Sequence, residues 1–273
     1  MLADLHIHST YSDGIYSPDE ICQKAARRGL SLLSITDHDT LAGLENKRAA
    51  AKKYGLQYLS GWEISAYEGE QKIHILGYGC ELGDAYERFT QARKDASFAR
   101  AKESAEKFQR LGFPVTFDEI LAQRASPDLP VHTMHIARAA AKYVGLKEGD
   151  TYREYLSPRG VSKSNLGRPT PQEAIDVIHA AGGLAFVAHP GRLDMDEKER
   201  ERVIRDLAAY GVDGIECVYT THTERETTAF SALAKELRLL CSGGSDTHYE
   251  DESHGIGAPS FFPDEELLKR LGL

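Results

Sequence analysis

Short apolar runs of β-type residues recur along this 273-residue chain, and each leads to a polar or ionisable cluster. Segments of helix length separate these runs, and an alternation of strands and helices predicts a parallel sheet. Seven such strands predict a closed or nearly closed α/β barrel, with its chemistry at the carboxyl ends of the strands. The seven runs cover residues 2–8, 32–36, 57–59, 72–78, 184–188, 214–218 and 239–241.

Capping residues mark the helix boundaries. Ser17 and Pro18 form a typical helix start, and Gly29 is placed to end that helix. Thr170 and Pro171 repeat the start signal. Further helices are predicted over residues 41–54, 198–210 and 224–237.

Residues 81–168 interrupt the alternation, because they contain no convincing buried strand. Apolar residues at helical spacing predict a long amphipathic helix over 89–111 and shorter helices over 115–121 and 134–144. We therefore expect a barrel domain built from residues 1–80 and 169–273. Residues 81–168 are expected to form a helical insertion, or cap domain, that folds over the mouth of the barrel.

The composition predicts a cytoplasmic protein without a membrane partner. No apolar run approaches the roughly 20 residues that a membrane-spanning helix needs. The N-terminus enters a strand at once, which leaves no room for a signal peptide. The four cysteines are scattered without a Cys-x-x-Cys pair, so they predict neither a disulfide framework nor a zinc ribbon.

Ligand-type side chains accompany the predicted strands. His6 and His8 are two residues apart in the first strand, so both project to one side and can bind one ion. Nitrogen and oxygen donors without a thiolate favour Mn²⁺, Fe²⁺ or Zn²⁺. Two or three ions would form a familiar catalyst of phosphate ester hydrolysis. The nine candidate donors are His6, His8, Asp13, His38, Glu63, His74, His189, Asp246 and His248.

Each donor also has a structural explanation when it is taken alone. His74 inside a strand could be a buried core histidine, Glu63 could cap a helix, and Asp13 before Gly14 could form a turn. Taken together, these explanations would require chance to place ligand-type residues at six of the seven strand ends. The joint pattern therefore predicts a metal centre.

Charge is divided unevenly along the chain. Residues 81–168 contain 15 basic and 12 acidic residues, a net charge of +3, whereas the rest of the chain has a net charge of −12. A mildly basic cap over an acidic, metal-lined mouth favours a phosphate-bearing ligand; an ordinary solvated helical surface is the alternative. The total of −9 argues against a protein that wraps long duplex nucleic acid.

Six motifs contain or flank these donors. They are Asp4-Leu5-His6-Ile7-His8-Ser9 with Asp13-Gly14, Ile35-Thr36-Asp37-His38-Asp39-Thr40, Gly61-Trp62-Glu63-Ile64-Ser65, Lys72-Ile73-His74-Ile75-Leu76-Gly77, Ala188-His189-Pro190-Gly191-Arg192 and Gly243-Gly244-Ser245-Asp246-Thr247-His248. In these motifs the chain resembles the PHP (polymerase and histidinol phosphatase) family of metal-dependent phosphoesterases, and the resemblance covers nearly the whole chain. It implies a hydrolase with a distorted seven-stranded (β/α)7 TIM-like barrel and a helical insertion domain.

Within that family the chain looks similar to small phosphatases that remove the 3′-phosphate from nucleoside 3′,5′-bisphosphates, as in pAp to AMP. Some members of this branch also trim RNA from its 5′ end. The helical insertion, the stretch 133–138 and Gly214-Ile215-Glu216 are shared with it. The branch usually has an arginine where Thr133 or Met134 stands. The resemblance implies a small phosphorylated nucleotide as substrate, with short RNA ends as an alternative.

The resemblance also implies a trinuclear centre, with manganese as the expected metal and iron or zinc as alternatives. His6, His8, Glu63 and Asp246 would hold one ion. Glu63 would bridge to a second ion held by His74 and His189. Asp13, His38 and His248 would hold the third. The ions would generate hydroxide at neutral pH by lowering the pKa of bound water.

Further residues receive roles from the same resemblance or from the chemistry of metal-activated hydrolysis. Glu63, Asp246 and His248 are expected to be catalytic, and Asp37 or Asp39 to orient a ligand imidazole. His222 and His254 are weaker candidates for protonating the leaving group. The candidates for substrate contacts are Arg100, Met134, His135, Arg192 and His248.

Other functions remain open from the sequence. Within the family, a 5′–3′ RNA exonuclease and a histidinol-phosphate phosphatase are alternatives. From another class, a non-catalytic metal-binding PHP module is possible, although the complete donor set argues against it. A metal-dependent amidohydrolase would usually carry a bridging lysine or another ligand order, neither of which is found.

Overall fold

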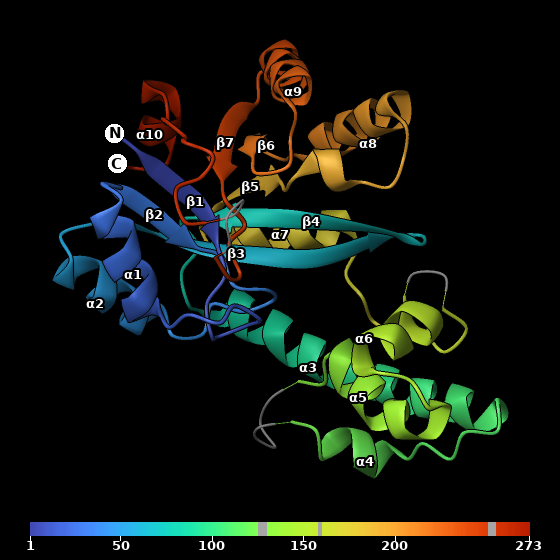
Figure 1. Cartoon of the computed structure of the whole chain (residues 1–273). Coiled ribbons are helices and arrows are strands. Elements are labelled where there is room, and N and C mark those ends of the chain that lie inside the picture. Colours follow the sequence, from blue (N-terminus) through green and yellow to red (C-terminus); the bar gives the residue numbers. More distant parts are fainter. Residues whose placement is uncertain (125–129, 158–159, 251–254) are drawn as a thin grey trace. The chain divides into compact units, whose positions relative to one another are not determined.

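The computed structural model describes residues 1–124, 130–157, 160–250 and 255–273. The chain divides into two compact units, one formed by Met1–Tyr86 with Pro169–Leu273 and the other by Glu87–Arg168. The first unit contains the sheet and both chain termini, and the second is helical (Figure 1). None of the described helices combines the length and the apolar character that a bilayer span requires.

Within the described residues, the first unit holds one mixed sheet of seven strands in sequential order. β1, β2 and β3 pair in parallel, as do β5, β6 and β7. The Asp246 amide donates to the His6 carbonyl oxygen at 2.7 Å, and the His8 amide donates to that of Thr247 at 3.0 Å. These bonds join the last strand to the first and confirm the predicted nearly closed barrel. The strands are β1 (Ala3–Ile7), β2 (Leu32–Ile35), β3 (Gln57–Glu68), β4 (Gln71–Tyr78), β5 (Leu184–Val187), β6 (Gly214–Tyr219) and β7 (Leu240–Gly244).

The prediction that all strands run parallel is wrong for β4, which pairs antiparallel with both β3 and β5. Only Gly69 and Glu70 separate β3 from β4. A parallel connection needs a crossover of a dozen or more residues, so this turn forces a hairpin. β3 also continues past its predicted end, and therefore Glu63 lies within a strand instead of following one. His74 lies within β4, as predicted.

Helices cover the sheet of the first unit, and their starts follow the predicted caps. The Ser17 and Thr170 side chains each accept a hydrogen bond from the amide of the third helical residue, which is a glutamate. The side chain of that glutamate accepts a hydrogen bond from the amide of the capping residue in return. α9 has the bounds predicted for it, Glu224–Leu237. The helices are α1 (Pro18–Arg27), α2 (Leu44–Lys53), α7 (Pro171–Ala180), α8 (Glu197–Tyr210), α9 (Glu224–Leu237) and α10 (Glu265–Arg270).

Large apolar side chains fill the interior of the barrel below the polar strand ends. Leu5, Leu59, Leu76, Tyr78 and Phe186 belong to one buried cluster. Burying a side chain of this size contributes about 1.5–3 kcal/mol. The packed floor therefore supplies a rigid base for the ionisable residues that follow along the same strands.

The second unit is formed by helices around a core of its own. Ala101, Ala105 and Phe108 of α3 pack with Ile120 and Ile136. α3 extends further toward the N-terminus than the predicted 89–111, because it begins at Asp84. The elements are α3 (Asp84–Arg110), α4 (Phe117–Leu121), α5 (Thr133–Val144), α6 (Glu148–Thr151) and the short π-helix η1 (Tyr152–Leu156).

Candidate metal centre

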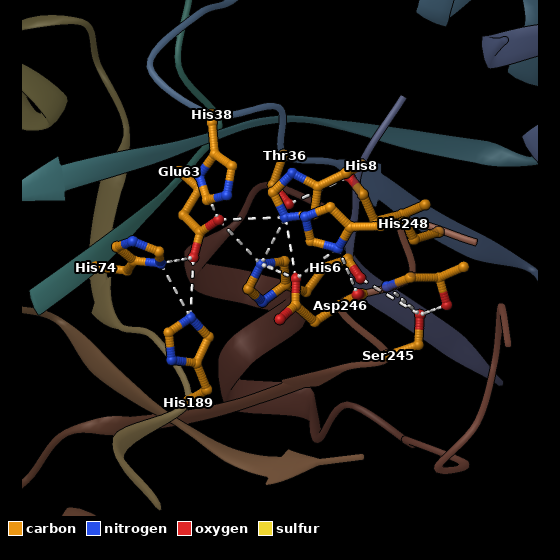
Figure 2. Close-up of polar contacts among 12 residues, drawn as sticks. His6, His8, Thr36, His38, Glu63, His74, His189, Ser245, Asp246 and His248 are labelled. Atoms are coloured by element: carbon orange, nitrogen blue, oxygen red, sulfur yellow. Dashed lines mark hydrogen bonds and ion pairs between the residues drawn. The ribbon is translucent and has the colours of Figure 1, made fainter. Parts of the chain in front are cut away.

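The structure brings the nine predicted donors together in the first unit, although they come from six strands and their loops. Figure 2 labels all of them except Asp13. β1, β3 and β4 carry three of them, and the other six lie in the segments that follow β1, β2, β5 and β7. The donors are His6, His8, Asp13, His38, Glu63, His74, His189, Asp246 and His248. Their ligand-type atoms form three overlapping groups.

The first group consists of His6, His8, Glu63 and Asp246, and it is almost completely buried. Nε2 of His6 lies 3.2 Å from Nε2 of His8 and 3.4 Å from Oε2 of Glu63. Oδ1 of Asp246 lies 3.0 Å from Nε2 of His8. Two imidazoles and two carboxylates therefore converge on one small volume.

The second group consists of His8, Asp13, His38 and His248. Oδ1 of Asp13 lies 3.3 Å from Nε2 of His248 and 3.6 Å from Nδ1 of His8. Asp13 is 55% exposed, so this side of the centre opens to solvent. A substrate can approach from here without displacing the buried first group.

The third group is organised by Glu63 and contains His38 and His74, with His189 beside them. Oε1 of Glu63 lies 2.7 Å from Nδ1 of His74 and 3.0 Å from Nε2 of His189. Oε2 of the same carboxylate lies 2.9 Å from Nδ1 of His38 and 3.2 Å from Nε2 of His8. Figure 2 shows Glu63 between these two sets of imidazoles. Its two oxygens thus serve different groups.

The donor atoms fit divalent transition metal ions. Ligands about 2.1 Å from a shared ion stand roughly 3.0–3.4 Å apart, which is the range of most contacts above. Several donor atoms are buried without a hydrogen bond to any described residue: Nδ1 of His8, Nδ1 of His38, Oε2 of Glu63, Nδ1 of His189 and Oδ1 of Asp246. Unpaired buried polar atoms are costly. Coordination to a metal ion would give most of them a partner.

The electrostatics of the centre balance buried carboxylates against imidazoles. Burial alone would raise the pKa of Glu63, but His74, His38 and His6 hold it well below its usual range. Burial alone would lower the pKa of His8, but Asp246 and Glu63 raise it to about 9. Burial is the main reason that the pKa of His74 lies well below its ordinary value. Because a histidine must be neutral to bind a metal ion, an ion at His8 would compete with a proton.

Strained backbone accompanies the centre. Among the described residues other than glycine, φ is positive at Asp39, His189, Arg238 and Asp246, and three of these four are next to or within the donor set. Such conformations cost about 1–3 kcal/mol each and persist where the surroundings fix them. Asp4 is one fixing group, because its carboxylate accepts hydrogen bonds from the amides of His6, Ser245 and Gly257.

Asp37 and Asp39 do not orient a ligand imidazole within the described structure, so that expectation is wrong. The Asp37 carboxylate accepts hydrogen bonds from the amide and hydroxyl of Ser9 and lies 2.6 Å from the Lys47 ammonium. Oδ1 of Asp39 accepts from the amide of Ser65 at 2.9 Å. Buried Lys47 explains the difference, because its charge draws Asp37 away from the imidazoles.

His222 is also a poor candidate for protonating a leaving group. Its Nδ1 donates to the Cys217 carbonyl oxygen, which lies 3.1 Å away, and its Nε2 accepts from the Gly191 amide at the same distance. Both ring nitrogens are therefore engaged. The other candidate, His254, lies outside the described residues.

Two residues that support the centre received no role from the sequence. Oε1 of Glu216 lies 2.9 Å from Nδ1 of His6, and Oε2 accepts from the His189 amide at 2.6 Å. The Tyr219 hydroxyl donates to Oδ2 of Asp246 at 2.8 Å. An ionisable residue inside the apolar run 214–218 was the available signal, but its partners depend on strand pairing across the barrel.

The predicted substrate contacts are divided between the two units. Arg192 ends the short 3₁₀-helix η2 (Pro190–Arg192), and its Nη1 lies 3.2 Å from Oδ2 of Asp246. In the second unit, Arg100 donates to the Leu166 carbonyl oxygen at 2.8 Å, and Met134 is 39% exposed. Burial, assisted by His132 and nearby arginines, lowers the pKa of His135 to about 4, so its ring is neutral at pH 7.

Comparison with known proteins supports one family. The model of the PHP domain matches residues 4–143. The 5′-3′ exoribonuclease of Haemophilus influenzae is 35% identical over 90% of this chain and 89% of its own length. The phosphoribosyl 1,2-cyclic phosphate 1,2-diphosphodiesterase of Eggerthella lenta is 33% identical over 91% of this chain and 94% of its own. The 3′,5′-nucleoside bisphosphate phosphatase of Chromobacterium violaceum is 33% identical over 91% and 88%.

Solved structures agree with the sequence relatives. An amidohydrolase from Chromobacterium violaceum, with bound SO4 and no metal, gives a TM-score of 0.79 at 30% identity, covering 99% of this chain and 95% of that one. A structure from Bifidobacterium adolescentis described as a metal-dependent phosphoesterase gives 0.76 at 25% identity, covering 98% and 94%. The chain therefore belongs to the PHP-domain family of metal-dependent phosphoesterases.

Proposed function

We propose that this protein hydrolyses the 3′-phosphate of nucleoside 3′,5′-bisphosphates, converting pAp to AMP. The observation that carries the proposal is the shared carboxylate of Glu63, with Oε1 2.7 Å from Nδ1 of His74 and Oε2 3.2 Å from Nε2 of His8. A carboxylate between two sets of imidazoles suits a site for more than one ion, a common catalyst of phosphate ester hydrolysis. The similarity to the Chromobacterium violaceum phosphatase supports the choice of substrate.

We assign the nine gathered donors as ligands of two or three manganese ions, with iron or zinc as alternatives. His6, His8, Glu63 and Asp246 would hold one ion. Glu63, His74 and His189 would hold a second, and Asp13, His38 and His248 a third. Imidazole and carboxylate donors without a thiolate support this choice of metals. Bound ions would supply a water of lowered pKa and positive charge beside the phosphate oxygens.

The protein's own groups fix the geometry of the reaction, and we assign Glu63, Asp246 and His248 as its catalytic residues. Nδ1 of His248 lies 2.9 Å from the Asp246 carbonyl oxygen, so this hydrogen bond keeps the proton on Nδ1. Nε2 is thereby left free on the side of Asp13, 3.3 Å away. His248 lies at the open side of the centre, where it can contact both an ion and the substrate.

Two cations next to the centre are suited to bind the phosphate. Arg192 is 56% exposed, so part of its guanidinium is available to a phosphate although Nη1 contacts Asp246. Lys72 precedes His74 by two residues in β4 and therefore projects to the same face of the sheet. Its ammonium forms no ion pair with any residue that the structure describes, which leaves its charge for an anionic ligand.

We assign further substrate contacts to the helical unit, namely Arg100, Met134 and His135. Because Nδ1 of His135 accepts from the His132 amide, the neutral ring carries its proton on Nε2 and can donate it to a phosphate oxygen. In the sequence, this unit is inserted between β4 and β5. β4 carries His74, and His189 follows β5. The net charge of −9 favours small or single-ended substrates over long duplexes.

A second candidate function is 5′–3′ trimming of RNA ends. It is favoured by the 35% identity to the Haemophilus influenzae exoribonuclease over 90% of this chain. Both reactions hydrolyse a phosphate ester, but only trimming cleaves a diester between nucleotides. The ligand set is the same for both, so the substrate contacts decide between them.

A phosphate-release panel tests the proposal. Manganese-loaded protein is assayed with a nucleoside 3′,5′-bisphosphate, a nucleoside 5′-monophosphate, histidinol phosphate, a phosphoribosyl 1,2-cyclic phosphate and short 5′-phosphorylated RNA. We expect the bisphosphate to give the highest kcat/KM, with only its 3′-phosphate released. Preference for RNA, with nucleotides as products, would support the second function instead. No hydrolysis of any substrate would contradict both.

A further inference from the structure

Glu216 on β6 links two parts of the centre that lie on different strands. Its side chain is completely buried and accepts on both oxygens. Oε1 lies 2.9 Å from Nδ1 of His6 on β1, and Oε2 lies 2.6 Å from the amide nitrogen of His189, which follows β5. β6 pairs with β5, so this contact spans neighbouring strands as well as the barrel interior. Glu216 does not belong to any of the three donor groups.

The first contact determines which nitrogen of His6 is free. Nε2 of His6 faces the centre, 3.4 Å from Oε2 of Glu63 and 3.3 Å from Oδ1 of Asp246. Nδ1 faces the opposite way, toward Glu216. A carboxylate accepts hydrogen bonds only, so it holds the proton on Nδ1 and leaves the Nε2 lone pair for a ligand.

The second contact holds a strained backbone. His189 has a φ of 25° and a ψ of 59°, a backbone conformation that residues other than glycine rarely adopt. Its amide donates to Glu216, while its ring places Nε2 3.0 Å from Oε1 of Glu63. Without the Glu216 acceptor this amide would be buried and unpaired, and the segment would relax toward a less strained conformation.

We propose that Glu216 is a positioning residue that couples two metal positions, because it fixes the ligand tautomer of His6 and the backbone of His189 at once. This inference rests on the proposed ligand set. Loss of Glu216 should weaken metal binding both at the position that uses His6 and at the position that uses His189. The position assigned to Asp13, His38 and His248 has no contact with Glu216 in the described part of the chain and should keep its ion.

Glutamine is an informative replacement at this position. Its amide has the same shape as the carboxylate but only one acceptor oxygen, so Glu216→Gln can satisfy one of the two donors. If the oxygen serves His189, the amide nitrogen faces Nδ1 of His6 and favours the tautomer with its proton on Nε2. That tautomer blocks the ligand atom. Glu216→Asp keeps the charge but is too short to reach both partners.

The first experiment measures metal affinity by competition with a chelator in the wild type, Glu216→Gln, Glu216→Asp and the control Glu201→Gln. Glu201 is an exposed residue of α8 that pairs with Arg205 and makes none of these contacts. We expect two of the ions to be bound about 10- to 100-fold more weakly in both Glu216 variants, the loss typical of removing a group that orients a ligand. One ion and the control should be unaffected. Unchanged affinity for all ions in Glu216→Gln would overturn the inference.

The second experiment requires no variant. Nitrogen-15 NMR of the zinc-loaded wild-type protein reports which ring nitrogen of His6 carries a proton. We expect a proton on Nδ1 and a metal shift on Nε2. A metal shift on Nδ1 would overturn the inference even if the variants fail to fold. No metal shift at His6 at all would instead refute the proposed ligand set, so the two failures are distinguishable.

Discussion

The hydroxyl of Tyr219 donates a hydrogen bond to Oδ2 of Asp246 at 2.8 Å, and this bond leaves Oδ1 of the same carboxylate facing the imidazoles of His6 and His8. One oxygen is thus held by the protein and the other is presented to the first donor group. Nη1 of Arg192 lies within hydrogen-bond distance of both Tyr219 and Asp246. The orientation of Asp246 therefore depends on a neutral hydroxyl as well as on a cation.

Replacing Tyr219 by phenylalanine removes that hydrogen bond and keeps the ring. A hydrogen bond to a charged group is worth about 1.5–3 kcal/mol, so we expect metal affinity to fall about 10- to 100-fold. Competition with a chelator measures the loss. Tyr210→Phe is the matched control, because Tyr210 donates to the exposed Glu68. Equal affinities in the two variants would show that Tyr219 does not hold Asp246.

Glu63→Gln tests the shared carboxylate. The change removes charge from two groups at once, and we expect turnover to fall by at least about 10²-fold, as for a lost electrostatic catalytic group. The side chain keeps its volume, so the circular dichroism spectrum should be unchanged. Glu68→Gln at the exposed end of the same strand is the control. Near-normal turnover of Glu63→Gln would refute the bridging assignment.

Metal binding should release protons at neutral pH. The pKa of His8 is raised from 6.5 to about 9 because its carboxylate neighbours outweigh burial, so in metal-free protein it is protonated at pH 7. We expect affinity to increase as the pH rises toward about 9 and to level off above it. Titration calorimetry in buffers of different ionisation enthalpy counts the protons. Affinity that is independent of pH between 6 and 9 would contradict this.

The same shift sets the sign of a stability effect. A raised histidine pKa stabilises the folded metal-free protein fully below about pH 6.5, and that contribution is lost as the pH rises through about 9. The melting temperature of metal-free protein should therefore fall over this interval. Metal-loaded protein should show a smaller fall, because the ions replace the protons.

Substrate choice is tested in the helical unit by Arg100→Ala and His135→Ala. Charge-assisted contacts to phosphate are worth about 1.5–3 kcal/mol each, so we expect kcat/KM for a nucleoside 3′,5′-bisphosphate to fall about 10- to 100-fold. Turnover of a simple aryl phosphate and the metal content should be little changed. Arg110→Ala, at the end of the same helix α3, is the control.

Two other outcomes have distinct meanings for these variants. Equal losses on both substrates would move Arg100 and His135 from recognition to general catalysis or folding. No loss on either substrate would remove them from the reaction.

Local signals in the sequence predicted much of the fold. Ser17 and Thr170 mark helix starts through side chains that bond within one turn, and such short-range contacts are visible in the sequence itself. The direction of β4 was missed because strand-like runs were interpreted as one parallel repeat. The two-residue turn at Gly69 and Glu70 was the signal that could have corrected it.

The donor set was predicted more completely than its supports. His6 and His8 could be predicted from their spacing, since strand geometry alone places residues two apart on the same side. The contact of Glu216 with His189 can be predicted only when the pairing of β5 with β6 is known. The role expected for Asp37 was wrong for the same kind of reason. Its partner Lys47 is a buried residue of α2, and that helix lies outside the motif that contains Asp37.

We propose above all that Glu63 bridges two metal positions, with one carboxylate oxygen at each. Anomalous scattering from crystals of protein purified without chelator and supplied with manganese tests it most directly. We expect two or three ions per chain, with one peak beside Oε1 of Glu63, near His74 and His189, and another beside Oε2, near His6 and His8. A single peak, or none at Glu63, would contradict it.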